Sequence, residues 1–361
     1  MRVAYVSTTD PTVSKSGGAL TVSGWLAELT SRGFEFHVVC RGTDRERRRI
    51  GDTTVTRLDA VWPAEELVGR LRRIDPDVVL VQSGWASIAL EAAAEIGVPS
   101  VFSVTAVSAS EELFARLDPT RFVANSEYTQ QWIASTCGRD STLVYPHIDF
   151  DFYEAGRDVD GTVSMLNPVR EKGGETFRRL ARLSPDREFL AKRGWYSLRA
   201  DDGSWDRAAI AASERTFSTE RSVTPDEVGT PTEIEFGDAP NVEFITVPDI
   251  RRFYRRSRVV LVPSRWRETF GRVVVEAMYN RIPVVASHRG GLPEACGGAG
   301  LLVEEYTNPV AWWRALRRLD DPDVYETVAE RGRERARRYR ETQSASIDRL
   351  AETIRAAASE G

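Results

Sequence analysis

Cysteine is scarce in this chain of 361 residues. Its three cysteines, Cys40, Cys137 and Cys296, are far apart and odd in number, so a disulfide framework or a zinc site is not expected. The sequence also lacks the run of about 18 apolar residues that a membrane-spanning helix needs. The apolar start at residues 3–6 is too short for a signal peptide. We therefore expect a cytoplasmic protein, with peripheral membrane contact left open.

Lysine is almost missing as well, since only Lys15, Lys172 and Lys192 are lysines among 49 basic residues. This preference for arginine indicates genome composition, and it makes each lysine slightly more informative. The formal net charge is −5, which gives no support to nucleic-acid binding because that usually needs a basic face. Hydrophobic residues make up 41% and charged residues 29% of the chain, an ordinary balance that excludes wholesale disorder.

The length suits two domains of roughly 150 residues each. The first half alternates short apolar strands with helices, and Gly33 and Gly97 end two of the helices. The strands are expected at residues 3–6, 36–40, 77–82, 100–104 and 121–124. Continuous apolar strands that alternate with helices predict a parallel sheet covered on both faces, which is the doubly wound α/β class.

A polar stretch around residues 145–161 interrupts this pattern, which then restarts. Further strands are expected at residues 162–166, 187–191, 242–245, 259–262 and 283–286. We therefore predict an N-terminal domain over 1–156 and a C-terminal domain over 157–340. Residues 201–239 are rich in small and polar residues and predict an insertion. The Arg-rich stretch 313–340 predicts a solvated helical surface, and a separate final helix at about 341–361 is expected to pack back on the N-terminal domain.

The strongest motif is the segment 267–278, which follows the strand ending at Val262. Glu268 lies in its loop, Gly271 permits close backbone approach where a helix starts, and Glu276 lies about one turn into that helix. The N–H groups at a helix N-terminus suit a diphosphate, and the two carboxylates suit sugar and ribose hydroxyls. The simpler alternative is a helix with an acidic residue near its N-terminus, which the helix dipole favours in any case.

Other stretches agree with this motif in order and spacing. They are 123–129, 144–149, 286–294 with Gly290-Gly291, and the early glycine pair Gly17-Gly18. Together with Glu268, seven residues and Glu276, they resemble the retaining glycosyltransferases of family four, over most of the chain except 201–239. The resemblance implies the GT-B fold, in which two Rossmann-like domains face each other across an interdomain cleft.

The resemblance also implies roles for residues. Glu268 would position the transferred sugar and Glu276 the ribose, while Thr269, Phe270 and Gly271 would contact the donor through this loop. Lys172 matches the family's phosphate-binding lysine, and an ammonium is a compact charge for phosphate. The simpler alternative for Lys172 is an exposed lysine with no functional role, which precedes a glycine turn. No metal and no cofactor are implied; the donor is a nucleotide-diphosphate sugar.

Two departures from the family pattern affect these roles. Asn167 stands where the family has an arginine, so one phosphate contact is in doubt unless Arg170 replaces it. Thr105 stands where many relatives carry a histidine near the sugar. On the acceptor or cleft side we place Gly17, Gly18, Trp85, Thr105 and His288. Trp85 is included because it follows a strand that ends at the expected cleft, and His288 because it precedes the Gly290-Gly291 pair.

Several alternatives remain open. Within the fold they are a nucleotide-sugar epimerase and a phosphorylase, and outside enzymes an inactive scaffold that binds a sugar or a partner. A dinucleotide dehydrogenase is disfavoured because no Gly-x-Gly-x-x-Gly follows the first strand. The sequence names neither the donor sugar, the base, the acceptor nor the oligomeric state.

Overall fold

The computed structural model describes residues 1–12, 14, 16–41, 48–50, 53–58, 64–82, 85–107, 111–193, 234–247 and 249–360. Most of the expected insertion at 201–239 therefore lies outside the described residues. The chain forms two compact units. Unit 1 contains Met1–His147 and Thr342–Gly361, and unit 2 contains the described residues between Ile148 and Glu341. Whether the units match the domains expected at 1–156 and 157–340 as separately folding bodies stays a prediction.

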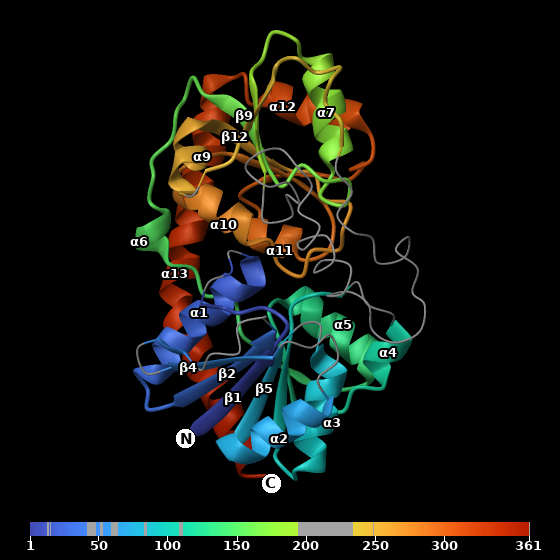
Figure 1. The fold of residues 1–361 in the computed structure, drawn as a ribbon. Helices are drawn as coiled ribbons and strands as arrows, with labels where there is room; N and C mark the ends of the chain where they lie inside the picture. Colours follow the sequence, from blue (N-terminus) through green and yellow to red (C-terminus); the bar gives the residue numbers. More distant parts are fainter. Residues whose placement is uncertain are drawn as a thin grey trace. The chain divides into compact units, whose positions relative to one another are not determined.

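Unit 1 is built on a sheet of eight strands in the order β3-β4-β2-β1-β5-β6-β7-β8 (Figure 1). Its strands are β1 (Arg2–Ser7), β2 (Glu35–Arg41), β3 (Arg48–Ile50), β4 (Thr53–Leu58), β5 (Val78–Gln82), β6 (Ser100–Val104), β7 (Arg121–Ala124) and β8 (Ser141–Leu143). All neighbours pair in parallel except β3 and β4. The expected parallel sheet is confirmed, and the β3–β4 hairpin and β8 are additions that the sequence analysis did not predict.

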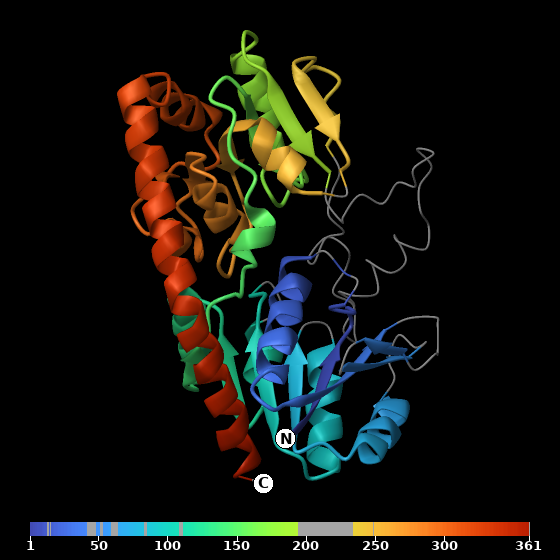
Figure 2. The ribbon, with the colours of Figure 1, turned by 90° about the vertical axis from the view of Figure 1, so that its left-hand side faces the viewer.

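Helices cover both faces of this sheet. They are α1 (Gly17–Thr30), α2 (Ala64–Ile74), α3 (Ala86–Glu95), α4 (Glu111–Ala115) and α5 (Glu127–Cys137). On one face Leu71 and Ile88 of α2 and α3 pack into a buried cluster. On the other face Trp25 of α1 packs together with Leu350 and Ile354, which belong to the last part of the final helix (Figure 2).

Unit 2 carries a sheet of six parallel strands in the order β11-β10-β9-β12-β13-β14. Its strands are β9 (Thr162–Leu166), β10 (Phe189–Lys192), β11 (Val242–Ile245), β12 (Ser257–Val262), β13 (Val284–Ser287) and β14 (Leu301–Val303). Numbered along the chain, the order is 3-2-1-4-5-6, the doubly wound arrangement whose strand order reverses between the first and fourth strands. Ligands of such sheets bind beyond the carboxyl ends of the strands at that point, here β9 and β12.

The helices of unit 2 are mostly short, with one exception. They are α6 (Phe150–Tyr153), α7 (Gly174–Leu183), α9 (Arg251–Arg256), α10 (Arg272–Tyr279), α11 (Leu292–Cys296), α12 (Pro309–Arg318) and the start of α13 (Pro322–Ala358). The expectation of a separate final helix is wrong: α13 is one helix of 37 residues that continues through residue 341 (Figure 2). None of the described helices is both long and apolar enough to cross a membrane.

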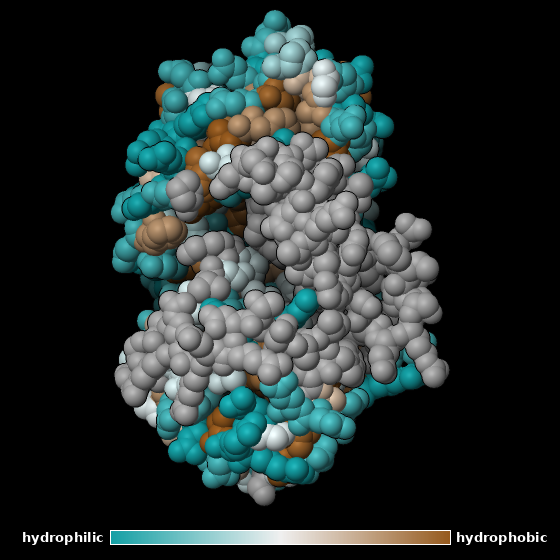
Figure 3. Space-filling model, viewed as in Figure 1, coloured by the Kyte–Doolittle hydropathy of each residue, from teal (hydrophilic) through white to brown (hydrophobic). Residues whose placement is uncertain are grey.

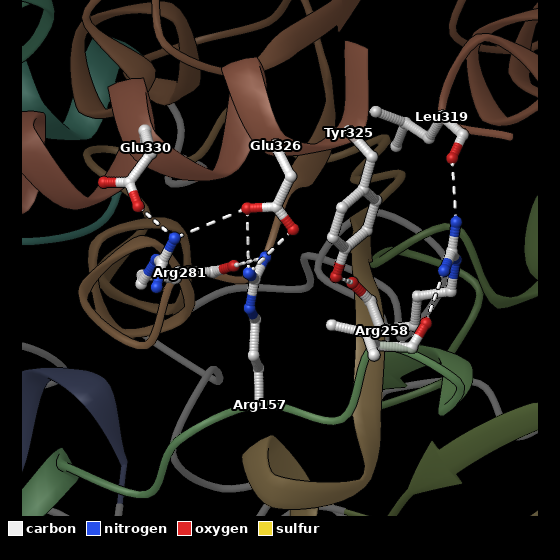
Figure 4. Close-up of polar contacts among 8 residues, drawn as sticks. Arg157, Arg258, Arg281, Leu319, Tyr325, Glu326 and Glu330 are labelled. Carbon is white, nitrogen blue, oxygen red and sulfur yellow. Dashed lines mark hydrogen bonds and ion pairs between the residues drawn. The ribbon is translucent and has the colours of Figure 1, made fainter. Parts of the chain in front are cut away.

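An ion-pair network fastens the first part of α13 within unit 2 (Figure 4). Arg157 donates to both carboxylate oxygens of Glu326, at 2.8 and 2.9 Å, and to the carbonyl of Arg281 at 3.3 Å. Arg281 in turn pairs with Glu326 and Glu330. The Tyr325 hydroxyl of the same helix donates to the carbonyl of Arg258 at 2.9 Å. These contacts join the segment before β9 to α13 through Glu326, Glu330 and Tyr325 of that helix.

Hydrophilic residues predominate among the described residues on the face that Figure 3 shows. Large apolar side chains that are exposed among the described residues are scattered along the chain: Met1, Phe152, Val159, Leu183, Val310 and Trp313. Single exposed apolar residues of this kind are normal for globular proteins and indicate no binding patch.

Candidate functional site

The loops that follow β9 and β12 meet at the switch point of unit 2. These strands are neighbours in the sheet, with Met165 opposite Leu261. The N–H groups of Arg265 and Trp266 both donate to the carbonyl of Glu171, at 2.9 and 3.0 Å. Gly173 has a φ of +83°, and a Cβ there would lie 1.8 Å from the Pro263 carbonyl oxygen. The two loops are therefore in direct backbone contact, which only glycine permits at position 173.

Lys172 and Glu268, 96 residues apart in the sequence, form an ion pair across these loops. The Lys172 Nζ lies 2.5 Å from the Glu268 Oε1, and the Ser264 hydroxyl donates to the same oxygen at 3.0 Å. The side chains are 27% and 15% exposed, so the pair is neither fully solvated nor sealed off. The structure thus brings together the two residues that the sequence analysis placed at the reaction centre, and it adds Ser264, which that analysis missed.

The two other predicted donor residues of the first loop lie in the same turn. Asn167 has a φ of +56°, which is the left-handed region, and its N–H donates to the carbonyl of Lys192 at 2.9 Å. Its side-chain Oδ1 is buried and has no hydrogen-bond partner among the described residues. Arg170 has an exposed side chain. Both residues border the Lys172 loop, and their part in donor binding stays a prediction.

Thr269, Phe270 and Gly271 connect Glu268 to α10. Thr269 is 8% and Phe270 is 2% exposed, and the Phe270 ring lies 5.4 Å from the ring of Tyr339 in α13. Gly271, with a φ of +104°, caps the N-terminus of α10. Both side chains are therefore buried within unit 2, and their part in donor binding stays a prediction.

Glu276, the second acid of the motif, lies inside unit 2. It is 6% exposed, and its Oε2 accepts a hydrogen bond from the Tyr254 hydroxyl at 2.7 Å. Its Oε1 lies 3.3 Å from the Arg272 Nε one turn earlier in α10. Burial, and then the nearby charge of Glu276, raises the pKa of Tyr254 well above its usual range, so this phenol is a hydrogen-bond donor at any ordinary pH. Tyr254 and Arg272 fix the orientation of the carboxylate, and neither was singled out in the sequence.

The Gly290-Gly291 pair interlocks with the Glu268 loop. The Gly291 N–H donates to the Glu268 carbonyl at 2.7 Å. A Cβ at Gly290 would lie 2.4 Å from the Glu268 carbonyl oxygen, and one at Gly291 would lie 2.3 Å from that of Thr269. The glycine pair therefore supports the backbone of the acidic loop. His288 precedes it and pairs with Glu304 at 2.8 Å, on an exposed part of unit 2.

Unit 1 has its own switch point, between β1 and β5. Ser16 caps α1, accepting a hydrogen bond from the Ala19 N–H, and Gly17 and Gly18 form the first turn. A Cβ at Gly18 would lie 3.8 Å from both amide atoms of Gln82 and 3.9 Å from the Thr105 Oγ1. The structure therefore brings Gly18 and Thr105 together around Gln82, a residue that the sequence analysis did not single out.

The sequence does contain one feature that could have identified Gln82, because it is a polar residue at the end of an otherwise apolar strand.

Trp85 is 2% exposed and belongs to the core under α2 and α3. A ring buried to this degree offers no face to a ligand, so the expectation of a sugar platform at Trp85 finds no support in the structure. Groups of three or more metal-binding side chains are absent from the described part of the chain.

Comparison with known proteins identifies the family. A model described as Glycosyltransferase Family 4 matches residues 16–152, and one described as Glycosyl transferases group 1 matches residues 224–321. The chain belongs to the family 4 glycosyltransferases. The family resemblance stated from the motifs is thus confirmed, while retention stays a prediction.

Curated relatives of this glycosyltransferase family align over short segments only. A D-inositol 3-phosphate glycosyltransferase of Corynebacterium kroppenstedtii is 37% identical over 120 residues, which cover 30% of this chain and 26% of that protein. Spore coat protein SA of Bacillus subtilis is 37% identical over 70 residues, 19% of each chain. The chain therefore matches about a quarter or less of the length of these relatives.

Solved structures match over nearly the whole chain. The sucrose-phosphate synthase of Thermosynechococcus elongatus superimposes with a TM-score of 0.76 and 18% identity, covering 99% of both chains. Anabaena HepE in complex with UDP and glucose gives 0.70 and 17%, covering 99% of this chain and 100% of that one. At this identity the likeness concerns the fold, and it confirms the GT-B class with its two Rossmann-like sheets. The cleft expected between them stays a prediction.

Proposed function

We propose that this chain is a retaining glycosyltransferase that moves a sugar from a nucleotide-diphosphate sugar to an acceptor hydroxyl, without a metal ion. The observation that supports it most is the Lys172–Glu268 pair. It places a cation and an acid 2.5 Å apart, at the point of a doubly wound sheet where ligands bind. Family membership agrees with this activity but names neither the donor nor the acceptor.

The roles follow from charge and position. The leaving group of the reaction is a nucleoside diphosphate, whose negative charge grows as the glycosidic bond breaks. Lys172 and the backbone N–H groups at the start of α10 would meet that charge, which is electrostatic stabilisation by groups already in place. Lys172 supplies a positive charge where other enzymes use a divalent cation, and this motivates the metal-free part of the proposal.

The two acids would orient the donor rather than react with it. Glu268 keeps 15% of its side chain exposed and would hold hydroxyls of the transferred sugar, so that the anomeric carbon faces the acceptor. Glu276 is fixed by Tyr254 and Arg272 and would accept from the ribose hydroxyls. In a front-face reaction with retention, a donor phosphate oxygen takes the acceptor's proton, which requires no protein base.

The rival proposals are an inactive scaffold and a nucleotide-sugar epimerase or phosphorylase. The scaffold is favoured by one observation, that Asn167 and Thr105 replace an arginine and a histidine of the family pattern. Both rivals share the donor site, so binding of a nucleotide does not separate them from a transferase.

The deciding experiment follows a panel of UDP-, GDP- and ADP-sugars in the presence of EDTA. Nucleoside diphosphates should raise the thermal midpoint by mass action. A transferase should release nucleoside diphosphate slowly by hydrolysis and faster with an acceptor, and NMR of the product should show the donor's anomeric configuration. An inverted product excludes retention, and loss of both stabilisation and turnover with EDTA excludes the metal-free reaction. Phosphate-dependent turnover or an epimerised nucleotide sugar would favour the rival enzymes, and no turnover at all would favour the scaffold.

A further inference from the structure

Gln82 is a buried amide with one polar atom unused. It ends β5 and is 2% exposed. Its Oε1 accepts a hydrogen bond from the Tyr5 hydroxyl at 2.8 Å, whereas its Nε2 has no hydrogen-bond partner in the described part of the chain. If the amide is turned over, Tyr5 bonds the nitrogen instead and the oxygen is left over, so one polar atom is unused in either orientation. A buried polar group without a partner costs free energy, and each such case requires an explanation.

A second unused group lies on the neighbouring strand. Ser103 of β6 is the register partner of Gln82, is 1% exposed, and has no partner for its Oγ among the described residues. Side chains alternate along a strand, and Val78, Leu80 and Val101 all pack on the α1 face of the sheet. By this alternation Gln82 and Ser103 share that face, toward the N-terminus of α1.

The space beside Gln82 is bounded by the first turn of α1. Gly18 leaves room there, because a Cβ at this position would lie 3.8 Å from the Gln82 amide. The Ser16 side chain accepts a hydrogen bond from the Ala19 N–H. The N–H groups of Gly17 and Gly18 lie in the first turn, where a helix provides no backbone acceptor. A helix N-terminus alone does not indicate a binding site. Here, however, the N-terminus of α1 faces the buried Gln82 amide, which has a polar atom without a hydrogen-bond partner among the described residues.

We infer that Gln82 is a specificity-determining residue of unit 1, which donates its amide N–H to an oxygen of a polyol bound between β5 and the start of α1. The class of ligand follows from the chemistry of the groups. An amide and the hydroxyls of Ser103 and Thr105 can both donate and accept, and this suits hydroxyl groups, which also do both. Under the proposed function, on which this inference rests for its biological meaning, the polyol or its monophosphate is the sugar acceptor.

A purely structural role predicts the same stability for a double variant but a different result for ligand binding. If Gln82 served only to bond Tyr5, replacing both residues by apolar ones of similar shape would leave the ligand-free protein as stable as before, and it would also leave ligand binding unchanged. Replacing Gln82 alone strands the Tyr5 hydroxyl, so the single change can lower stability for reasons unrelated to ligands. The double change Tyr5→Phe with Gln82→Leu removes that ambiguity.

The test uses the whole chain, without donor, and four probes: myo-inositol, myo-inositol 1-phosphate, glucose and fructose 6-phosphate. Binding is measured by ligand-observed NMR, and the thermal midpoint is recorded with and without UDP, GDP or ADP. We expect at least one probe to bind the native protein and to bind Gln82→Leu and the double variant at least tenfold more weakly. The double variant should keep a native-like midpoint and the same nucleotide-induced rise. Gln130→Leu is the control, because the Gln130 amide of the same unit donates to the Ser141 carbonyl at 2.8 Å. This variant should bind the probes like the native protein.

Gln82→Glu tests whether the amide contacts a hydroxyl oxygen or a phosphate oxygen of the ligand. The change replaces the donor nitrogen by a charged acceptor. The variant should therefore keep part of its affinity for an uncharged polyol and lose its affinity for a ligand whose phosphate lies at this position. The inference is overturned if no probe binds the native protein, if Gln82→Leu binds within twofold of it, or if nucleotide stabilisation is lost together with polyol binding. Failure of the proposed function looks different: polyol binding persists and depends on Gln82, while no nucleotide sugar is turned over.

Discussion

The two switch points of this chain have the same topology and opposite chemistry. In unit 2 the loops after β9 and β12 carry the Lys172–Glu268 ion pair, at 2.5 Å. In unit 1 the ends of β1 and β5 bring Gly18 to the uncharged side chains of Gln82 and Thr105. Unit 2 therefore offers an ion pair at this position, whereas the groups around Gly18 in unit 1 are neutral, although the loop after β1 also holds the Asp10–Arg57 ion pair. A charged diphosphate suits the first site and a polyol the second. The residues carried by the loops, and not the shared fold, therefore determine which ligand each unit binds.

The two sites also differ in how firmly they are built. In unit 2 three loops touch through their backbones, at Gly173, Gly290 and Gly291. In unit 1 a Cβ added at Gly18 would lie at an ordinary van der Waals distance of 3.8 Å from the Gln82 side chain. We expect the donor side to tolerate little change in its loops and the other side to tolerate more.

The largest effect should come from Gly173→Ala, with Gly298→Ala as its control. Both glycines have positive φ, +83° and +76°, but a Cβ meets the Pro263 carbonyl at 1.8 Å in the first case and nothing within 4 Å in the second. The control should lose about 1–2 kcal/mol from backbone strain. Gly173→Ala should lose a further ~1–3 kcal/mol from overpacking, together with nucleotide stabilisation. Denaturant unfolding measures both, and equal losses would mean that the loop contact is not important.

Next in size is the charge pair itself. Lys172→Ala should reduce donor-dependent turnover at least ~10-fold, since a charge-assisted hydrogen bond contributes roughly 1.5–3 kcal/mol. Glu268→Gln should lower turnover strongly too, and the two losses should not add, because the residues contact each other. Lys172→Arg should be partly tolerated. Arg170→Ala is the control from the same loop: if it is damaging and Lys172→Ala is silent, the phosphate site lies around Arg170 instead.

How far the sequence predicted these features depends on how local their causes are. Short apolar runs predicted most strands of both sheets, because burial on two faces leaves a continuous apolar segment, but β4, β8 and β14 were missed. The β3 strand, Arg48–Ile50, has two charged residues and gave no such signal. The expected start of the final helix near residue 341 was wrong, because a polar, arginine-rich segment continues a helix as readily as it ends one.

The candidate site was predicted in part, through motifs. Glu268 and Lys172 were expected from the resemblance, but their contact depends on the adjacency of β9 and β12, which no local pattern contains. Tyr254 and Gln82 were missed for a related reason. A tyrosine in a helix and a glutamine at a strand end acquire meaning only through their partners, Glu276 and Tyr5.

A pH experiment separates the units further. In unit 1 the buried Asp10 accepts from Thr12 and from Arg57 Nη2, the latter at 2.8 Å. Burial opposes ionisation, but the hydrogen bonds of Thr12 and Arg57 outweigh it and hold the pKa of Asp10 below its ordinary 3.8. A lowered folded pKa stabilises the protein above the unfolded value, and that stability is lost as the pH falls through the folded value.

Asp10→Asn should therefore cost about 1–2 kcal/mol at pH 7, and less as the pH approaches 3. Urea unfolding of the native protein and the variant over this range measures the difference. Asp160→Asn, at an exposed aspartate in unit 2, is the control for replacing a carboxylate as such. A penalty for Asp10→Asn that is constant with pH would rule out the charge as its origin.

A smaller effect concerns Tyr254. Tyr254→Phe removes the hydrogen bond to the Glu276 carboxylate, worth about 1 kcal/mol, so the KM for the donor should rise about fivefold with little change in kcat. Tyr325→Phe is the matched control, because it removes a tyrosine hydrogen bond of 2.9 Å elsewhere in unit 2. If both variants change KM equally, Tyr254 acts through stability and not through the position of Glu276.

The finest comparison uses the cysteines as reporters, since each unit contains one fully buried thiol. Cys40 lies in β2 of unit 1 and Cys296 in α11 of unit 2, and burial raises the pKa of both to about 12. Only the thiolate reacts with a disulfide reagent, so at pH 8 both should label slowly, by local opening, and after the partly exposed Cys137. With Cys137→Ser as background, a nucleoside diphosphate should slow labelling of Cys296 more than that of Cys40, and a bound polyol should do the reverse. Mass spectrometry of the labelled peptides over time measures both rates in one sample. Equal protection of both thiols by a nucleotide alone would contradict the assignment of the donor to unit 2.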